Sequence, residues 1–590
     1  MPRCGSTLRT LFLASGLLGA SAFVRAQSAA QASSPAPGAS KPFAEGSEAL
    51  RRGDLGAARA AFEAAVRLNP TDVQSRNALG LALLAQNNAT AATVQFKEAL
   101  RISPTFLQAR LNLCKARIEL GDFDGAVREG SAATRAAPNN PDAHAALARA
   151  LGAASKTPQA ITSLRRAIAL APKRADLHDD LGTLLVQQSH SENAVAEFAE
   201  ALQLNPELAS AHLHLGVLQF EQRQFELAEQ HLSRAKELVP ANFLALNYLA
   251  RTYREQAKLP EAIAALQSSL RIQPGQADVL NLLGQFLQRV GNPVEAADAF
   301  RKVLALDPHD AEAQNNLGLA LLQTGDGEGA IAAFRAALQA RPADTGYQGN
   351  LGAAYLQKAD FAGAVTIFRA ALQQDPNSPS LHYNLGLALK LQDKLSEAVE
   401  DLRAAEALDP AQPDAPYTLG VTLWQMGDLD GSVSELQKAI HAKPDYAEAY
   451  YTLGTVLKQQ AKLQESAQAL QEAIRLEPDF AGAHTTLAGV LRQLGDPEGA
   501  AAESKLGSEL ARQRTDMQAA VFATNSGRRL RSVGDLNGAV SQFRAAIQAV
   551  ENYAPAHFEL AIALRQMGKK EDAAAEFQRA AALDPKLVAP

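Results

Sequence analysis

Apolar residues recur along this chain at the spacing of one helix face, in two successive blocks that repeat with a fixed period. A clear first block places its apolar and small residues at i, i+3, i+4 and i+7: His382, Leu385, Gly386 and Leu389. A turn signal such as Gly427-Asp428 follows the first block. A second amphipathic block, as at residues 329–340, then ends before a proline, which cannot continue a helix. The pattern therefore predicts two helices in each repeat.

Prolines mark the end of most repeats. They recur at one constant step, which is about 34 residues long. The series is Pro70, Pro104, Pro138, Pro172, Pro206, Pro240, Pro274, Pro308, Pro342, Pro376, Pro410, Pro444 and Pro478. Arg512 continues the phase without a proline, five extra residues follow, and the phase resumes through Glu551 to Pro585. This regularity predicts 16 repeats, because internal periodicity on this scale is typical of stacked helical arrays.

Three further columns keep the same phase. Twelve residues before each proline position lies alanine in 14 of the 16 repeats, with Ser432 and Ser466 as the exceptions. A second column is leucine followed by a small residue, as in Leu385-Gly386, and a third is mostly phenylalanine or leucine. Small residues mark close helix contacts, and the large ones fill the space around them.

The order Leu-Gly, a large residue, Ala-x-x-x-Phe and then Pro on this period resembles the tetratricopeptide repeat (TPR) family. The resemblance covers about residues 39–587 and implies an all-α fold, a right-handed α-solenoid (superhelix) of about 16 helix-turn-helix repeats. It also implies that the first helices of the repeats form a concave groove for binding. The family often has tryptophan at the start of its first helix, where this chain has His, Leu, Gln or Tyr.

The repeats are expected to be unevenly distributed. Repeats 1–14 fall in residues 39–514, the extra residues in 515–519, and repeats 15–16 in 520–587. No proline occurs between Glu498 and Ser532, which predicts a lengthened second helix there. The last repeat has no polar capping helix after Pro585, so it is either open to a partner or a second copy, or closed by its own polar outer face.

The N-terminus has the pattern of an export signal. Arg3 and Arg9 precede or begin an apolar run at residues 10–24, and Val24-Arg25-Ala26 provides small residues for cleavage. We expect a signal peptide at 1–26, with cleavage after Ala22 as the second choice and an uncleaved anchor as the alternative. Residues 27–41 are rich in Ala, Ser and Pro and predict a flexible leader. The expected location is the periplasm or the outside of the cell, with no transmembrane segment after signal removal.

Charge and cysteine content narrow the function. Loss of residues 1–26, with three arginines and no acid, would change the formal net charge from −6 to −9, which argues against a nucleic acid partner. Cys4 lies in the expected signal peptide and Cys114 in the small-residue column, so no internal disulfide is expected. No phosphate loop, serine-nucleophile motif or zinc-protease motif occurs. We therefore expect no enzyme activity, no cofactor and no metal.

Six of the 11 histidines share one column, which we call the histidine column: His144, His178, His212, His382, His484 and His557. Packed neighbouring helices lie about 8–10 Å apart, whereas one zinc ion needs each histidine nitrogen at about 2 Å. The column also lies on the stripe that packs within the repeat. These histidines are therefore expected to pack in the core and not to bind a metal.

A second stripe, rotated by about 100° from the core stripe, carries aromatic and cationic residues in repeats 10–16. By resemblance to TPR modules these positions line the concave groove: Tyr383, Lys390, Tyr417, Trp424, Tyr451, Lys458, Arg492, Arg531 and Arg565. A neighbouring asparagine column includes Asn316, Asn350 and Asn384 and resembles the asparagine ladder of O-linked N-acetylglucosamine transferases, where the amides hold a peptide main chain. The ladder is interrupted here by Thr418, Thr452 and Thr486.

These residues predict a non-catalytic scaffold that binds a protein or extended peptide of unknown identity, acidic for preference, in the groove. Arginine and lysine bind carboxylates, and aromatic rings stack on the ligand. An inner face whose cations pair with neighbouring acids is the alternative interpretation. Two other functions fit the architecture: an accessory factor for polysaccharide assembly or export that binds an acidic glycan, and the targeting subunit of a separate enzyme.

Overall fold

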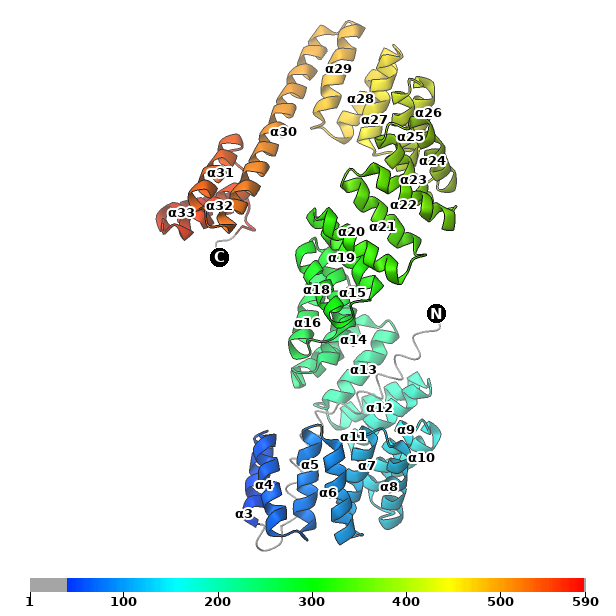
Figure 1. The fold of residues 1–590 in the computed structure, drawn as a ribbon, viewed down its shortest axis with the longest axis vertical. Helices are drawn as coiled ribbons and strands as arrows, with labels where there is room; N and C mark the ends of the chain where they lie inside the picture. The colour runs from blue at the N-terminus through cyan, green and yellow to red at the C-terminus, as the bar shows by residue number, and fades with distance from the viewer. Residues whose placement is uncertain (1–39, 588–590) are drawn as a thin grey trace. The chain divides into compact units, whose positions relative to one another are not determined.

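The computed structural model describes residues 40–587, and every regular element in this range is an α-helix. This confirms the predicted all-α solenoid fold. The chain divides into two compact units, Met1–Leu306 and Asp307–Pro590, which are described separately (Figure 1). The predicted signal peptide and the leader up to residue 39 lie outside the described residues, while Ser40 and Lys41 belong to the first described helix.

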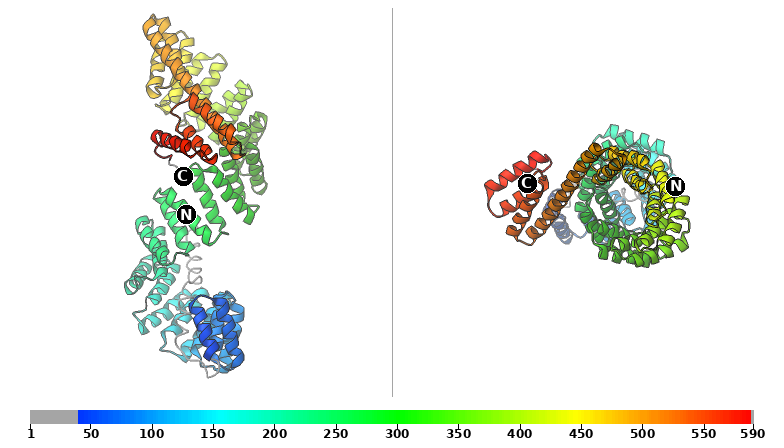
Figure 2. Two further views of the ribbon diagram at one scale, coloured as in Figure 1. Left: turned by 90° about the vertical axis from the view of Figure 1, so that its left-hand side faces the viewer. Right: turned by 90° about the horizontal axis from the view of Figure 1, so that it is seen from above.

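Unit 1 consists of eight consecutive helix pairs within its described part. Their bounds are α3 (Ser40–Arg51), α4 (Leu55–Leu68), α5 (Val73–Ala85), α6 (Ala89–Ile102), α7 (Leu107–Glu119), α8 (Phe123–Ala136), α9 (Pro141–Ala153), α10 (Thr157–Leu170), α11 (Ala175–Gln187), α12 (Ser191–Leu204), α13 (Ala209–Glu221), α14 (Phe225–Leu238), α15 (Phe243–Glu255), α16 (Leu259–Ile272), α17 (Ala277–Arg289) and α18 (Pro293–Leu306). Each pair packs against the next along the unit (Figure 2).

Unit 2 continues the same arrangement through its described residues. Its helices are α19 (Ala311–Thr324), α20 (Gly327–Ala340), α21 (Thr345–Gln357), α22 (Phe361–Gln374), α23 (Pro379–Leu391), α24 (Leu395–Leu408), α25 (Asp414–Gln425), α26 (Leu429–Ala442), α27 (Ala447–Gln459), α28 (Leu463–Leu476), α29 (Ala481–Leu494), α30 (Pro497–Ser532), α31 (Leu536–Ala549), α32 (Ala554–Gln566) and α33 (Lys570–Leu583). Odd-numbered helices up to α29, and then α32, are the first helices of their repeats.

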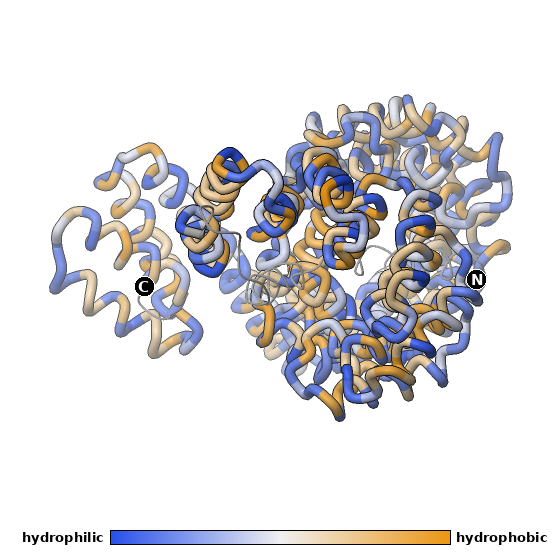
Figure 3. The backbone as a smooth tube through the Cα atoms, turned by 90° about the horizontal axis from the view of Figure 1, so that it is seen from below, coloured by the Kyte–Doolittle hydropathy of each residue, from blue (hydrophilic) through white to orange (hydrophobic). Residues whose placement is uncertain are grey.

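The turn between the two helices of a repeat follows from its sequence. Gly325 ends α19 with φ +83°, a left-handed conformation that costs glycine little. Asp326 then caps α20, because its Oδ1 accepts a hydrogen bond of 2.9 Å from the backbone N–H of Gly329. Hydrophobic and hydrophilic residues alternate along each helix, as expected for amphipathic pairs (Figure 3).

The core of each repeat is a close contact between its two helices. A Cβ built on Gly284 of α17 would lie 2.6 Å from the ring of Phe300 of α18, which is fully buried. The same glycine–phenylalanine contact, at the same sequence separation, recurs at Gly80–Phe96, Gly182–Phe198, Gly318–Phe334, Gly352–Phe368 and Gly527–Phe543. The predicted small and large columns therefore meet face to face inside each repeat.

One helix joins two repeats. The predicted lengthened helix is present as α30, which has 36 residues and contains the five extra residues 515–519 (Figure 1). Its N-terminal half packs on α29 as the second helix of one repeat, and its C-terminal half packs on α31 as the first helix of the next. Sixteen repeats of two helices would give 32 helices, and this fusion leaves 31 in the described residues.

Candidate binding surface

All the stripe and asparagine-column residues predicted to bind lie on first helices of unit 2 or on α30. They are Asn316 on α19, Asn350 on α21, Tyr383, Asn384 and Lys390 on α23, Tyr417 and Trp424 on α25, Tyr451 and Lys458 on α27, Arg492 on α29, Arg531 on α30 and Arg565 on α32. Neighbouring first helices lie side by side, because Trp424 Nε1 donates to Gln459 Oε1 of the next one at 2.6 Å. We call the stripe side of α23, α25, α27 and α29 the first-helix face. The binding role of these residues stays a prediction.

Three cations of this face are not used by the fold. Within residues 40–587, no hydrogen bond or ion pair engages the side-chain nitrogens of Lys390, Lys458 or Arg492. Lys390 is half-buried, and this burial lowers the pKa of its ammonium group. Lys458 extends over Gly489 of the next first helix, where a Cβ would lie 2.9 Å from its Nζ. The positive charges thus stand on a surface that offers them no acid.

The two predicted cations beyond α29 are engaged. Arg531 donates through Nη2 to Glu559 Oε2 at 2.9 Å, and Arg528 donates through Nε to Oε1 of the same carboxylate at 2.7 Å. Arg565 lies over the ring of Phe577, 5.3 Å from its centroid. The glutamate at position 559 occupies the asparagine column, so the sequence held the signal for this pairing. The continuous run of unengaged cations therefore ends at Arg492.

First-helix cations of unit 1 are also engaged, as the alternative interpretation of the stripe requires. Arg149 donates through Nε to Asp180 Oδ2 at 2.9 Å. Arg251 lies 3.7 Å from Asp278. Ion pairing of first-helix cations is thus common in this chain, which makes the three unpaired cations of the first-helix face distinctive.

The tyrosines of the stripe are partly used in packing between repeats. The ring of Tyr417 stacks on Tyr446 with 4.9 Å between centroids, and Tyr451 stacks on Phe480 at 4.8 Å. Tyr446 and Phe480 each stand just before the first helix of the following repeat. Tyr383 packs against the apolar cluster of α24 and α25. These contacts fix the rings in place and leave their outer parts half-exposed.

The asparagine column is divided between two uses. Three side chains at its position bond to the preceding repeat, which ties neighbouring first helices together: Asn112 to Asn77, His214 to Asp179 and Asn350 to Asn315, each at 2.8 Å. Asn384 makes no side-chain hydrogen bond within the described residues. Its amide, next to Tyr383 and one helix turn or two from Lys390, is therefore the member of the column best placed to bind a ligand.

The histidine column serves the repeat itself. His382 Nε2 lies 3.1 Å from the carbonyl oxygen of Pro376, and its Nδ1 lies 2.8 Å from Asp401 Oδ1. The same two contacts, to a carbonyl six residues before and a carboxylate nineteen residues after, occur at His178, His484 and His557. Each ring thus links both helices of its repeat to the preceding turn. The acid at +19 was a sequence signal that our core-packing expectation did not use.

One histidine of the column lacks its acid. His212 faces His231, with 2.9 Å between their Nδ1 atoms, and burial followed by the charge of His212 lowers the pKa of His231. Stability is therefore lost as the pH falls from the ordinary histidine pKa of about 6.5 through this lowered value. We expect His231→Glu to stabilise the protein by about 1 kcal/mol near pH 5.5 and by less near pH 8, measured by urea unfolding. His309→Glu, at an exposed site outside the column, is the control, and an equal gain from both variants would contradict this explanation.

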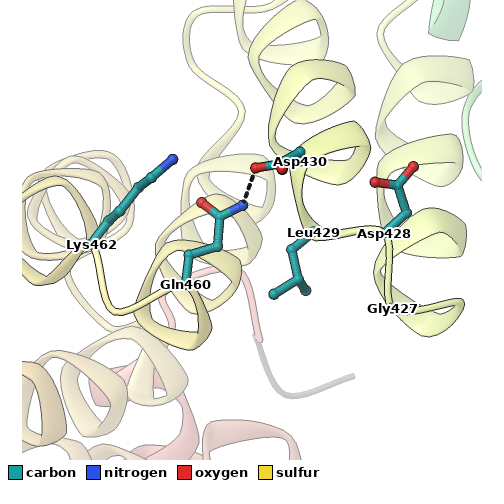
Figure 4. A pocket seen from close by; sticks show the side chains of 6 residues that line it. All are labelled: Gly427, Asp428, Leu429, Asp430, Gln460 and Lys462. Atoms are coloured by element: carbon teal, nitrogen blue, oxygen red, sulfur yellow. Dashed lines mark hydrogen bonds between the residues drawn. The ribbon is translucent and has the colours of Figure 1, made fainter.

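Shallow depressions occur at the turns between neighbouring repeats. One is lined by Gly427, Asp428, Leu429, Asp430, Gln460 and Lys462 (Figure 4). Its polar groups already act in the fold: Asp428 caps α26 through Gly431, and Gln460 Nε2 donates to Asp430 Oδ1 at 2.9 Å. A second depression, which includes Ser155 and Gln188, occupies the equivalent place in unit 1. Such hollows are a product of repeat geometry.

Other chemistry is not supported by the described residues. Within 40–587, no group of three or more His, Cys, Asp or Glu side chains is arranged to hold a metal ion. Burial raises the pKa of the Cys114 thiol to about 12, and Sγ contacts the carbonyl oxygen of Ala126 at 3.3 Å, so this thiol is a packing group. Across the same range, no helix has both the length and the apolarity to cross a membrane.

Comparison with protein families agrees with this architecture. Four family models match, three described as tetratricopeptide repeat and one as TPR repeat, at residues 43–105, 180–243, 281–345 and 451–504, at 83–150 and 389–457, at 354–393, and at 554–587. The chain belongs to the tetratricopeptide repeat family. Tetratricopeptide repeats indicate a protein–protein interaction scaffold, and no activity of an enzyme is indicated by any of these matches.

Solved structures of other TPR-like chains are similar to this tetratricopeptide repeat protein. MamA is 25% identical over 28% of this chain and 96% of its own, with a TM-score of 0.27. The APC/C hetero-tetramer Cut9–Hcn1 is 14% identical over 89% and 96%, with a TM-score of 0.32. Yeast Tom70 is 18% identical over 72% and 96%, with a TM-score of 0.31. No curated protein matches the chain.

Proposed function

We propose that this chain is a non-catalytic scaffold that binds an extended, acidic segment of a partner protein on the first-helix face. The observation that carries this proposal is the set of three cations, Lys390, Lys458 and Arg492, that have no acid within the described residues. A partly desolvated cation without a partner is unfavourable in the free protein, and a ligand carboxylate would relieve that cost.

The layout of the face favours an extended peptide. The three cations occupy the same position on first helices one or two repeats apart, with Trp424 between Lys390 and Lys458. An extended chain advances about 3.3 Å per residue, so acids several residues apart would meet successive cations. The unengaged amide of Asn384 can donate to and accept from a peptide main chain, and the fixed rings of Tyr417 and Tyr451 offer apolar contact.

We further propose that the protein acts after export, in the periplasm or outside the cell, on the basis of the signal-peptide pattern at residues 1–26. An acidic glycan presents carboxylates too, but it has no main-chain amide to pair with Asn384. The peptide is therefore the preferred ligand. The glycan, which would fit a role in polysaccharide handling, becomes one arm of the test.

Reversing two of the cations is expected to abolish binding of an acidic probe. Lys458→Glu combined with Arg492→Glu should weaken binding of a fluorescent oligoglutamate peptide at least tenfold, because two attractions become repulsions. Fluorescence anisotropy at two salt concentrations measures the affinity, with an oligolysine peptide and a hyaluronan fragment as comparison probes. Tighter binding of the hyaluronan fragment than of the peptide would instead support the glycan.

The matched control places the same charge change elsewhere. Arg403→Glu with Arg544→Glu alters two exposed cations on second helices of the same unit and gives the same formal net charge, −10 in place of −6. This control should retain most of the affinity. If it loses as much as the first-helix variant, or if neither variant changes binding, the first-helix face is not the binding surface.

A further inference from the structure

The C-terminal half of α30 exposes positions that the other repeats bury. In every other repeat after the first, the third and tenth positions of the first helix are buried, most often as alanine. In the repeat that begins within α30, these positions hold Phe522, which is 77% exposed, and Arg529, which is also exposed. Val533, at the end of the same side of the helix, is 74% exposed. We call Phe522, Arg529 and Val533 the open face of α30.

The continuity of α30 is the reason for this exposure. Elsewhere the second helix of one repeat lies beside the first helix of the next and covers its third and tenth positions. Here the preceding second helix is the N-terminal half of α30 itself, so it runs end to end with the C-terminal half (Figure 1). One side of the C-terminal half is therefore left without the helix that covers its counterparts.

The contact between α31 and α32 shows what normally covers such a face. Val540 of α31 packs in one cluster with Ala563 of α32, and Ile547 of α31 packs in another with Ala556. Large side chains of the second helix thus meet small side chains of the following first helix. Ala556 and Ala563 are fully buried by this contact.

The side-chain sizes are exchanged at the two free surfaces of this part of the chain. On α33, one full repeat after Val540 and Ile547, stand Ala574 and Ala581. On α30, one full repeat before Ala556 and Ala563, stand Phe522 and Arg529. A large residue on the first helix and a small one on the second conserve the volume of the usual contact, an exchange that packed interfaces tolerate. The outer side of α33 therefore fits the open face of α30 in size.

Charge is also complementary in the register that the repeats use. Where repeats meet, the first turn of a second helix lies beside the end of the next first helix, as in the bond from Gln460 to Asp430. The residue of α33 equivalent to Asp430 is Glu571, which is exposed. In the same register Glu571 would stand opposite Val533 and within reach of Arg529, one helix turn earlier. The acid of α33 thus meets the arginine of the open face.

We propose that the open face of α30 binds α33 of a second copy of this chain. The contact repeats, between two copies, the packing that already joins neighbouring repeats inside one copy. Each copy offers one α33 and one open face, so the contact is heterologous and adds copies in a row. This proposal is independent of ligand binding on the first-helix face, because it uses other residues.

Concentration-dependent assembly of the purified full chain tests the proposal. Sedimentation equilibrium should give a weight-average mass that rises with concentration above the 62.5 kDa of one copy. Phe522→Ala, which restores the residue most common at this position, and Arg529→Glu should each weaken association at least tenfold. Leu68→Ala, at a site 64% exposed in unit 1, is the control and should associate like the unmodified protein.

A charge exchange identifies the occupant. Glu571→Arg alone should weaken association, and Arg529→Glu combined with Glu571→Arg should restore it, because the pair is re-formed with reversed signs. A mass of one copy at all concentrations would overturn the proposal. So would association that persists in Phe522→Ala and Arg529→Glu, or a double variant no better than either single one, since the open face would then bind something other than α33.

Discussion

Gly284→Ala is expected to destabilise the protein by about 2 kcal/mol, although alanine is the better helix former. A Cβ at this position would lie 2.6 Å from two ring atoms of Phe300, which is fully buried and has no free space to move into. Overpacking of this kind costs about 3 kcal/mol at its upper range, and the helix propensity of alanine returns about 1 kcal/mol. Urea unfolding measures the loss, and amide exchange should localise it to α17 and α18, since repeats depend mainly on their neighbours.

The chain itself supplies the rescue for this variant. In the repeat of α9 and α10, Ala148 stands at the glycine position and Leu164 at the phenylalanine position, and both are fully buried. Gly284→Ala combined with Phe300→Leu reproduces this natural pair and should regain most of the lost stability. A double variant that is less stable than Gly284→Ala alone would show that ring loss, and not overlap, dominates the energetics of this contact.

The fold was predictable from the sequence because its information is local and repeated. The close approach of Gly284 and Phe300 follows from two columns that keep their spacing in many repeats. The fused helix α30 followed from the absence of proline between Glu498 and Ser532. In both cases the deciding residues lie within one or two helices of each other, and helical periodicity alone places them.

The state of the candidate site was less predictable, because it depends on side chains from adjacent repeats. The stripe treats Arg492 and Arg531 alike, yet Arg531 is bound by Glu559 from the next repeat, whereas Arg492 has no acid within the described residues. Tyr446, which stacks on Tyr417, stands before its helix and outside the stripe. A column describes one repeat at a time and therefore does not reveal which partners cross between repeats.

Ala511→Pro is expected to open the middle of α30 without unfolding the repeats on either side. Residues 511–515 are all exposed, so this part of the helix is held by its own backbone hydrogen bonds and by no packing. A proline inside a helix costs about 3 kcal/mol, because it removes a hydrogen bond and clashes with the preceding turn. Such a change raises the open population by roughly 100-fold, at 1.4 kcal/mol for each factor of ten.

Limited trypsin digestion detects this opening, because Arg512 and Arg514 lie in the exposed segment. The proline variant should be cut there about 100-fold faster than the unmodified protein. Ala511→Gly, which costs about 1 kcal/mol, should be cut only several-fold faster. Equal cutting of all three proteins would mean that the helix already opens at this point, so the C-terminal repeats would be joined to α29 by a flexible link and the exposure of Phe522 would no longer follow from a continuous α30.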